Sequence, residues 1–208
     1  MTSRDNRPLF VGDRLFDKGV LSWALKDHVD GALQEVVYLR NRNAPRMAVA
    51  KVRRWAVSAA SLTPLTLDPG RPRVAVFSDL DSLRPGAGGP RTMVAMYVGW
   101  RGSGELWQWA PDDVKSHDFR GDVRPFGEEG ELTISATVAI GHEAGVRAAL
   151  EDCRKRLERL LHFQKQQLER FNKGVPALVE AAFPTLAARK KVLDELKSLG
   201  MPAERTTD

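Results

Sequence analysis

The sequence predicts an α+β fold in which an antiparallel sheet packs against a long C-terminal helical hairpin. Two patterns support this prediction. In the last third of the chain, apolar residues recur at alternating steps of four and three, which is the period of a helix that buries one face. In the middle of the chain, apolar and polar residues alternate, which is the period of strands with one buried face.

The length and composition fit one domain, or a small domain with an appendage. Of the 208 residues, 42% are hydrophobic and 28% are charged, which is ordinary for a packed protein and excludes wholesale disorder. We therefore divide the chain into an α+β domain over residues 1–142, a helical hairpin over residues 143–202 and a disordered tail over residues 203–208.

Cysteine usage and hydropathy predict a cytoplasmic protein with no membrane partner. Cys153 is the single cysteine, so no disulfide can form within the chain, as is usual in a reducing compartment. The first eight residues are polar, and the apolar region of a signal peptide does not follow them. No window approaches the run of about 18 apolar residues that a membrane-spanning helix needs.

The hairpin is predicted from one apolar seam and one break. The seam consists of Val146, Leu150, Cys153, Leu157, Leu160, Leu168 and Phe171. Only Gln164 interrupts it. Asn172 and Gly174 tolerate the left-handed backbone that ends helices, and Pro176 fits the first turn of a new helix. A second helix is therefore expected after residue 174, with a kink at Pro184.

Four segments are predicted to be strands, in a sheet of about four or five strands. Residues 92–100 and 105–109 flank a glycine-rich turn and are expected to pair as a β-hairpin. Residues 132–140 and 73–77 supply two further strands. The acidic stretch between residues 111 and 131 is expected to be a loop.

The N-terminal part of the chain is less clearly patterned. Residues 21–33 are amphipathic with a helical period and are predicted to form a helix. Residues 34–39 and 47–58 mix β-branched, small and basic side chains, so helix and strand both stay open for them.

One dense basic run is a candidate nucleic-acid-binding site. Its residues are Arg40, Arg42, Arg46, Lys51, Arg53 and Arg54. No acidic residue lies among them, so the segment carries a charge of +6, and Trp55 follows it. Basic side chains that bind phosphates, with an aromatic ring that stacks on a base, would have this composition. A solvated basic face is the favoured interpretation, because no known nucleic-acid-binding motif frames the run.

Tryptophans on the expected β-hairpin are candidate protein-interface residues. Trp107 and Trp109 would share one face of the second strand, and Trp100 could join them from the first. Core packing and an aromatic contact surface both remain open, with core packing favoured.

An acidic pair is the only feature that suggests an enzyme. Asp79 and Asp81 follow an apolar segment, and this motif resembles the first motif of haloacid-dehalogenase-type phosphohydrolases. There the first Asp attacks phosphorus beside a Mg²⁺ ion. The family's other motifs are missing, so an ordinary turn is the favoured interpretation. No catalytic, metal or cofactor site is predicted.

The helical region resembles a poorly characterised module of bacterial conflict and antiphage-defence proteins. The resemblance is carried by Leu161, Phe163, Phe171, Asn172, Leu178, Arg189, Lys190, Leu193 and the segment from Leu199 to Pro202. It implies a non-enzymatic adaptor or sensor whose partner is a separately encoded effector or a second copy of the chain. Nucleic-acid binding through the basic run is the alternative, and a Mg²⁺-dependent phosphohydrolase is a distant one.

Overall fold

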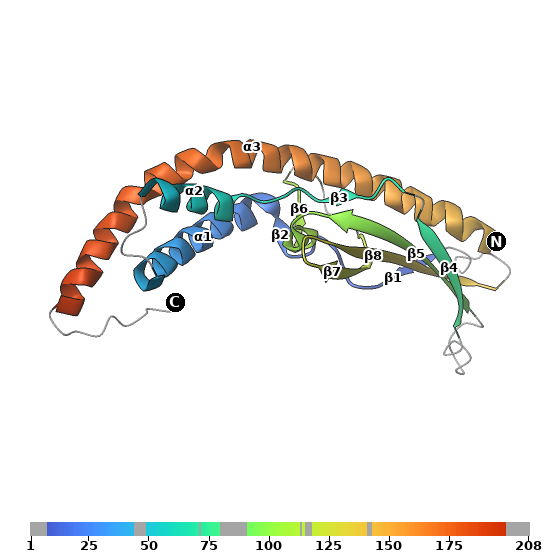
Figure 1. Cartoon of the computed structure of the whole chain (residues 1–208). Coiled ribbons are helices and arrows are strands. Elements are labelled where there is room, and N and C mark those ends of the chain that lie inside the picture. The colour runs from blue at the N-terminus through green and yellow to red at the C-terminus, as the bar shows by residue number, and fades with distance from the viewer. Residues whose placement is uncertain are drawn as a thin grey trace. The chain divides into compact units, whose positions relative to one another are not determined.

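The computed structural model describes residues 8–43, 49–70, 72–79, 91–112, 114, 118–140 and 143–198. Its α+β fold confirms the predicted class (Figure 1). In chain order the elements are β1 (Leu9–Val11), β2 (Gly19–Val20), α1 (Leu21–Asn43), α2 (Val49–Ala60), β3 (Thr66–Leu67), β4 (Arg73–Asp79), β5 (Arg91–Arg101), the 3-10 helix η3 (Gly104–Gln108), β6 (Trp109–Ala110), β7 (Asp122–Phe126), β8 (Glu129–Ala139) and α3 (Glu143–Ser198).

The residues group into two compact units. The first contains Met1–Ala24 and Thr63–Glu169, and the second contains Leu25–Leu62 and Arg170–Asp208. This grouping differs from the predicted division after residue 142, because α3 contributes one end to each unit. The predicted tail at residues 203–208 lies outside the described residues.

The first unit is built on an antiparallel sheet whose two central strands are long. β5 and β8 pair along their whole lengths, from Arg91 opposite Ala139 to Arg101 opposite Glu129. On the side of β5 away from β8, β4 and β3 pair with successive parts of β5. On the side of β8 away from β5, β1 and β7 pair with successive parts of β8. The predicted strands at residues 73–77 and 132–140 are confirmed as β4 and β8.

One face of this sheet forms the core of the first unit. Its buried positions on the central strands are Val94, Met96, Val98, Trp100, Leu132, Ile134, Ala136 and Val138. α3 runs along the sheet (Figure 1) and buries its predicted seam, with Val146, Leu150, Cys153, Leu157, Leu160 and Leu168 each exposed by 4% or less. The apolar period therefore identified the buried face of the helix.

Gln164, the polar residue within this seam, is fully buried at 0% exposure. Its side-chain Nε2 donates hydrogen bonds of 2.9 Å to the backbone carbonyls of Leu106 and Trp109. Both donor hydrogens of the amide are used, whereas its Oε1 is buried without a hydrogen-bond partner among the described residues. Gln164 thus ties α3 to the segment that contains η3 and β6.

The predicted helical hairpin is wrong, because α3 is one helix of 56 residues. Gly174 costs a helix interior about 1 kcal/mol and Pro176 removes a backbone hydrogen bond. In the second unit, however, Val175 and Val179 are fully buried in a cluster with α1 and α2. Asn172 exchanges two hydrogen bonds with the backbone of Leu62 instead of ending the helix. Burial of this face outweighs the local signals for a break.

The predicted β-hairpin of residues 92–100 and 105–109 is also wrong. Residues 104–108 form η3, and only Trp109 of the predicted segment enters a strand, the short β6. β5 has no side left for a hairpin partner, because β8 occupies one side while β3 and β4 occupy the other. The loop expected between residues 111 and 131 contains a strand, β7, which pairs with β8.

The two segments left open by the sequence belong to helices. Residues 34–39 extend α1, and residues 49–58 lie in α2. In the second unit, α1 and α2 pack together through small and branched side chains, among them Ala32, Leu33, Val52 and Ala56. Burial in the tertiary structure therefore decides between helix and strand where the local sequence favours neither.

Truncating a seam residue should unfold the protein more easily. Leu157 is 1% exposed, so Leu157→Ala should lower the free energy of unfolding by about 2–5 kcal/mol in chemical denaturation. The matched control is Phe163→Ala on the same helix, whose side chain is 49% exposed. Its effect should stay within about 0.5 kcal/mol. Equal effects of the two substitutions would contradict the packing described here.

Candidate interaction surface

The second face of the sheet carries two neighbouring rows of mostly apolar residues. Cross-strand pairing places Phe77, Met93, Thr137 and Leu9 in one row. The adjacent row contains Ala75, Ala95, Ser135 and Val11. We call the five apolar members that are not buried the open-face patch: Leu9, Val11, Ala75, Phe77 and Met93. Ala95 and Ser135, in the middle of the second row, are only 1% and 5% exposed.

Two side chains of the patch are well exposed. Leu9 is 55% exposed and Phe77 is 42% exposed, while Met93 is half-buried between their strands. The solvent face of an antiparallel sheet normally carries polar residues. Because exposed apolar side chains that gather across strands mark contact sites more often than isolated ones do, the patch is the candidate functional surface.

Polar residues bound the patch on one side. In the next row Arg73 lies over the ring of Tyr97, with its guanidinium carbon 4.5 Å from the ring centroid. The same guanidinium lies 3.4 Å from the Glu131 carboxylate. A central apolar area with a polar margin has the composition of a protein-contact surface.

The structure distributes the predicted basic run over two helices. Arg40 and Arg42 lie in α1, and Arg46 lies outside the described residues. Lys51, Arg53 and Arg54 are exposed side chains of α2. The Arg53 guanidinium lies 3.3 Å from the carboxylate of Glu180, and Trp55, also on α2, is 37% exposed.

The candidate interface tryptophans lie in different surroundings. Trp107 is 3% exposed, and its ring packs against Phe16 and Trp100 at centroid distances of 5.9 and 5.8 Å. It belongs to the core, so it offers no contact surface, and its assignment as an interface residue is corrected. Trp109 is half-buried. The two do not share a strand face, because Trp107 belongs to η3.

The acidic pair forms no described catalytic grouping. Asp79 ends β4, its side chain is not described, and Asp81 lies outside the described residues. Within the described part of the chain, no three His, Cys, Asp or Glu side chains are placed to hold a metal ion together. His28 Nε2 lies 3.2 Å from the Ala59 carbonyl, which is a structural contact.

Asp112 is the carboxylate with the clearest structural function. Its Oδ1 accepts a 2.9 Å hydrogen bond from the backbone N–H of Ser22, at the first turn of α1. Burial raises the pKa of this carboxyl, but hydrogen bonds with Gln167 and Ser22 outweigh it, and the pKa lies below its ordinary value. Asp112 therefore caps a helix and stays ionised at neutral pH.

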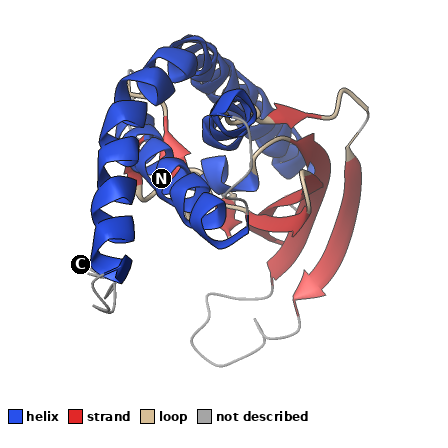
Figure 2. Ribbon diagram, turned by 60° about the vertical axis from the view of Figure 1, so that its left-hand side comes forward, coloured by secondary structure: helices blue, strands red, loops and turns tan. Residues whose placement is uncertain are grey.

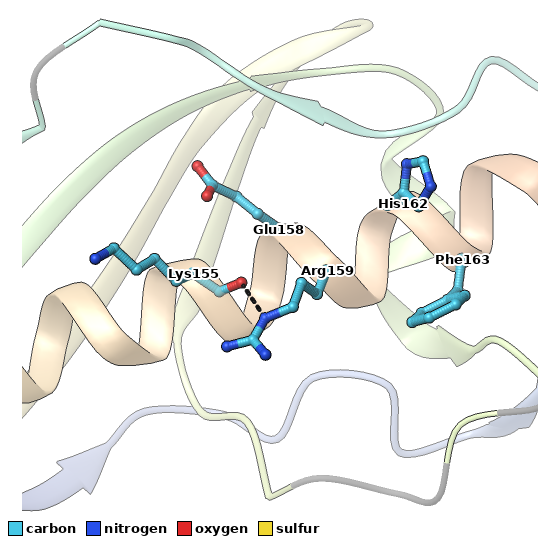
Figure 3. A pocket seen from close by; sticks show the side chains of 5 residues that line it. All are labelled: Lys155, Glu158, Arg159, His162 and Phe163. Carbon is cyan, nitrogen blue, oxygen red and sulfur yellow. Dashed lines mark hydrogen bonds between the residues drawn. The ribbon is translucent and has the colours of Figure 1, made fainter.

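A shallow hollow of about 470 Å³ lies along the outer side of α3 and was not foreseen from the sequence (Figure 3). Its lining residues are Lys155, Glu158, Arg159, His162 and Phe163. Figure 3 shows them following one another along a single helix, with the Arg159 Nε donating to the Lys155 carbonyl at 3.4 Å. Side chains from one helix alone enclose little, so we assign the hollow no ligand.

Comparison with known proteins returned no relatives: no protein-family model, curated protein or solved structure matches this chain. Among the described residues, no helix combines the length and the hydropathy of a membrane span. The candidate surface therefore stands on its own geometry.

Cys153 should be an unreactive thiol in the folded protein. It is 4% exposed, and burial raises its pKa, an effect that nearby Arg156 opposes and Asp152 reinforces. Since the thiolate is the nucleophile, a thiol reagent at pH 8 should modify Cys153 rapidly only after denaturation. Rapid stoichiometric modification without denaturant would show that the seam opens.

Proposed function

We propose that this protein is a non-enzymatic interaction module that binds a protein partner through the open-face patch. One observation carries the proposal: Leu9, Met93 and Phe77 align across four strands on the face of the sheet opposite the core. Such a row offers a partner a flat apolar area on a rigid support. Burial of this area would drive association at about 25 cal/mol per Å² before the costs of binding.

The biological setting comes from the resemblance of the helical region. It supports an adaptor or sensor component of a bacterial assembly of the antiphage-defence type, acting with a separately encoded effector. The apolar character of the patch favours a protein partner over a nucleic acid, because phosphate contacts require cationic side chains.

A charge placed in the patch should abolish partner binding. We expect Leu9→Asp to weaken binding at least about tenfold, because an ionised carboxylate would lose hydration in the complex. The assay is pairwise co-purification with proteins encoded by adjacent genes, followed by titration of the one that binds. Ile140→Asp is the control, since Ile140 is 59% exposed and lies outside the patch. Binding that tolerates Leu9→Asp would contradict the proposed surface.

Nucleic-acid binding is the second candidate, and the exposed face of α2 supports it. Lys51, Arg54 and Trp55 are exposed and follow helical spacing, so one side of the helix presents two cations beside an indole ring. The ion pair of Arg53 with Glu180 reduces the positive charge beside them.

Salt dependence separates the two candidates. If Lys51 and Arg54 bind phosphates, replacing both with Ala should reduce the slope of log K against log salt by about 2, at roughly 0.9 per phosphate. The control, Lys26→Ala with Lys173→Ala, removes the same charge from exposed residues outside α2. We expect negligible binding to DNA or RNA at about 150 mM salt and silent substitutions. Micromolar binding lost only in the α2 variant would establish the second candidate.

A further inference from the structure

β4 is an exposed edge strand of seven residues. Its inner side pairs with β5, and no described strand pairs with its outer side. Figure 2 shows no ribbon of the described chain beside the outer edge of this outermost strand. Val76 and Phe77 expose 64% and 42% of their surfaces on opposite faces of the strand. Among the described residues, the outer backbone edge of β4 and the side chains of Val76 and Phe77 are therefore accessible to another strand.

β4 lacks the devices that usually protect an edge. Such devices are short length, charged residues, proline and bulges. On the opposite side of the sheet, β1 has only three residues, and β7 contains Pro125 and Arg124. The five residues of β4 between Arg73 and Asp79 are Val, Ala, Val, Phe and Ser, with neither charge nor proline. The sheet is thus protected along one side and open along the other.

The sequence of β4 is complementary to itself in the antiparallel direction. If a two-fold axis passes beside Val76, Arg73 of one copy lies opposite Asp79 of the second copy, and the same pair forms again at the other end. In this register Val76 faces Val76, and Ala75 faces Phe77. Opposite charges at the ends and a small residue opposite a large one are favourable cross-strand pairs.

We infer that β4 is the site at which two copies of this chain pair edge to edge, forming one continuous sheet across a two-fold axis. The inference deepens the proposed function, on which it rests, by naming a second copy as a partner. A two-fold interface of this kind is closed, because each copy contributes the same edge strand, β4, and pairing occupies the outer side of both. The partner adds a strand to a sheet edge, so main-chain hydrogen bonds supply the contact.

The pairing would also enlarge the candidate interaction surface. Phe77 belongs to one row of the open-face patch and Ala75 to the other. Because Phe77 faces Ala75 of the second copy in this register, each row continues into a row of the other copy. The dimer would therefore present one apolar surface of twice the width to a further partner.

Both residues of the end pairs have a charged neighbour within their own chain, since Asp79 lies opposite Arg91 in the register of β4 and β5. Arg73 contacts Glu131 at 3.4 Å, but the Arg73 side chain remains 71% exposed. Exposed ion pairs contribute little to stability, so exchange of Glu131 for Asp79 of the second copy costs little.

Sedimentation of the full chain from about 10 μM to about 1 mM tests the pairing. We expect a reversible monomer–dimer equilibrium that Val76→Lys weakens at least about tenfold, because two cations would meet at the axis. Phe126→Lys is the control, since Phe126 is 69% exposed on β7. This control should leave the equilibrium unchanged. A monomer at every concentration, open-ended assembly, or a dimer insensitive to Val76→Lys would overturn the inference.

Charge exchange tests the register. Arg73→Asp alone and Asp79→Arg alone should each weaken the dimer, because like charges would face each other twice. The double exchange should restore it. An aspartate at position 73 lies near Glu131 of its own chain in both the Arg73→Asp variant and the double variant. Restored dimerisation in the double variant can therefore come only from the contact with the second copy. Weakening without restoration would overturn the proposed register.

Two further measurements separate loss of pairing from misfolding of a variant. Thermal unfolding monitored by circular dichroism identifies any variant that fails to fold. For the wild type, slower amide exchange at residues 74–78 with rising concentration would support the pairing without any substitution. A monomeric wild type that still binds a partner through Leu9 overturns this inference alone. A dimer that binds no further protein supports the pairing and contradicts the proposed function.

Discussion

The first unit depends on the burial of one apolar seam of α3 against one face of the antiparallel sheet. A helix with a single seam covers a single face, and on the other face of the sheet Leu9 and Phe77 stay exposed. Leu150, Leu157 and Leu168 are buried on the helix, and Met96, Leu132 and Ile134 are buried on the strands. The open-face patch lies on the face of the sheet opposite this seam.

Gln164 shows how a polar residue can be accommodated in such a seam. Its amide binds the carbonyls of Leu106 and Trp109, so the segment after β5 is held to the helix by hydrogen bonds and apolar contact together. A leucine at position 164 would continue the seam but would leave two carbonyls without this donor. The geometry of η3 and β6 thus depends on the one residue that interrupts the apolar period.

The open-face patch and the outer edge of β4 share a physical origin. Long central strands satisfy each other's backbone groups, but the outermost strands must end the sheet. On the side of β7, Pro125 and charged neighbours make further pairing unfavourable, whereas β4 carries no such residue between its ends. The apolar face and the apolar edge meet at Phe77, which belongs to both. One residue therefore links binding of a different protein to pairing of identical copies.

Local pattern alone determined the class of the fold, the buried face of α3, and the strands β4 and β8. In α3 and β8 the apolar period is strong, and burial agrees with it. The tertiary structure decided the rest, because it weighs long-range burial against local preference. Gly174 and Pro176 predict a helix end, yet burial of Val175 and Val179 keeps α3 continuous. Trp107 was a candidate surface residue of a strand paired with β5. Because β5 already has partners on both sides, that strand does not form, and the Trp107 ring is buried. The open-face patch combines residues from β1, β4 and β5 that are up to 84 positions apart, from Leu9 to Met93. Only strand pairing brings them together.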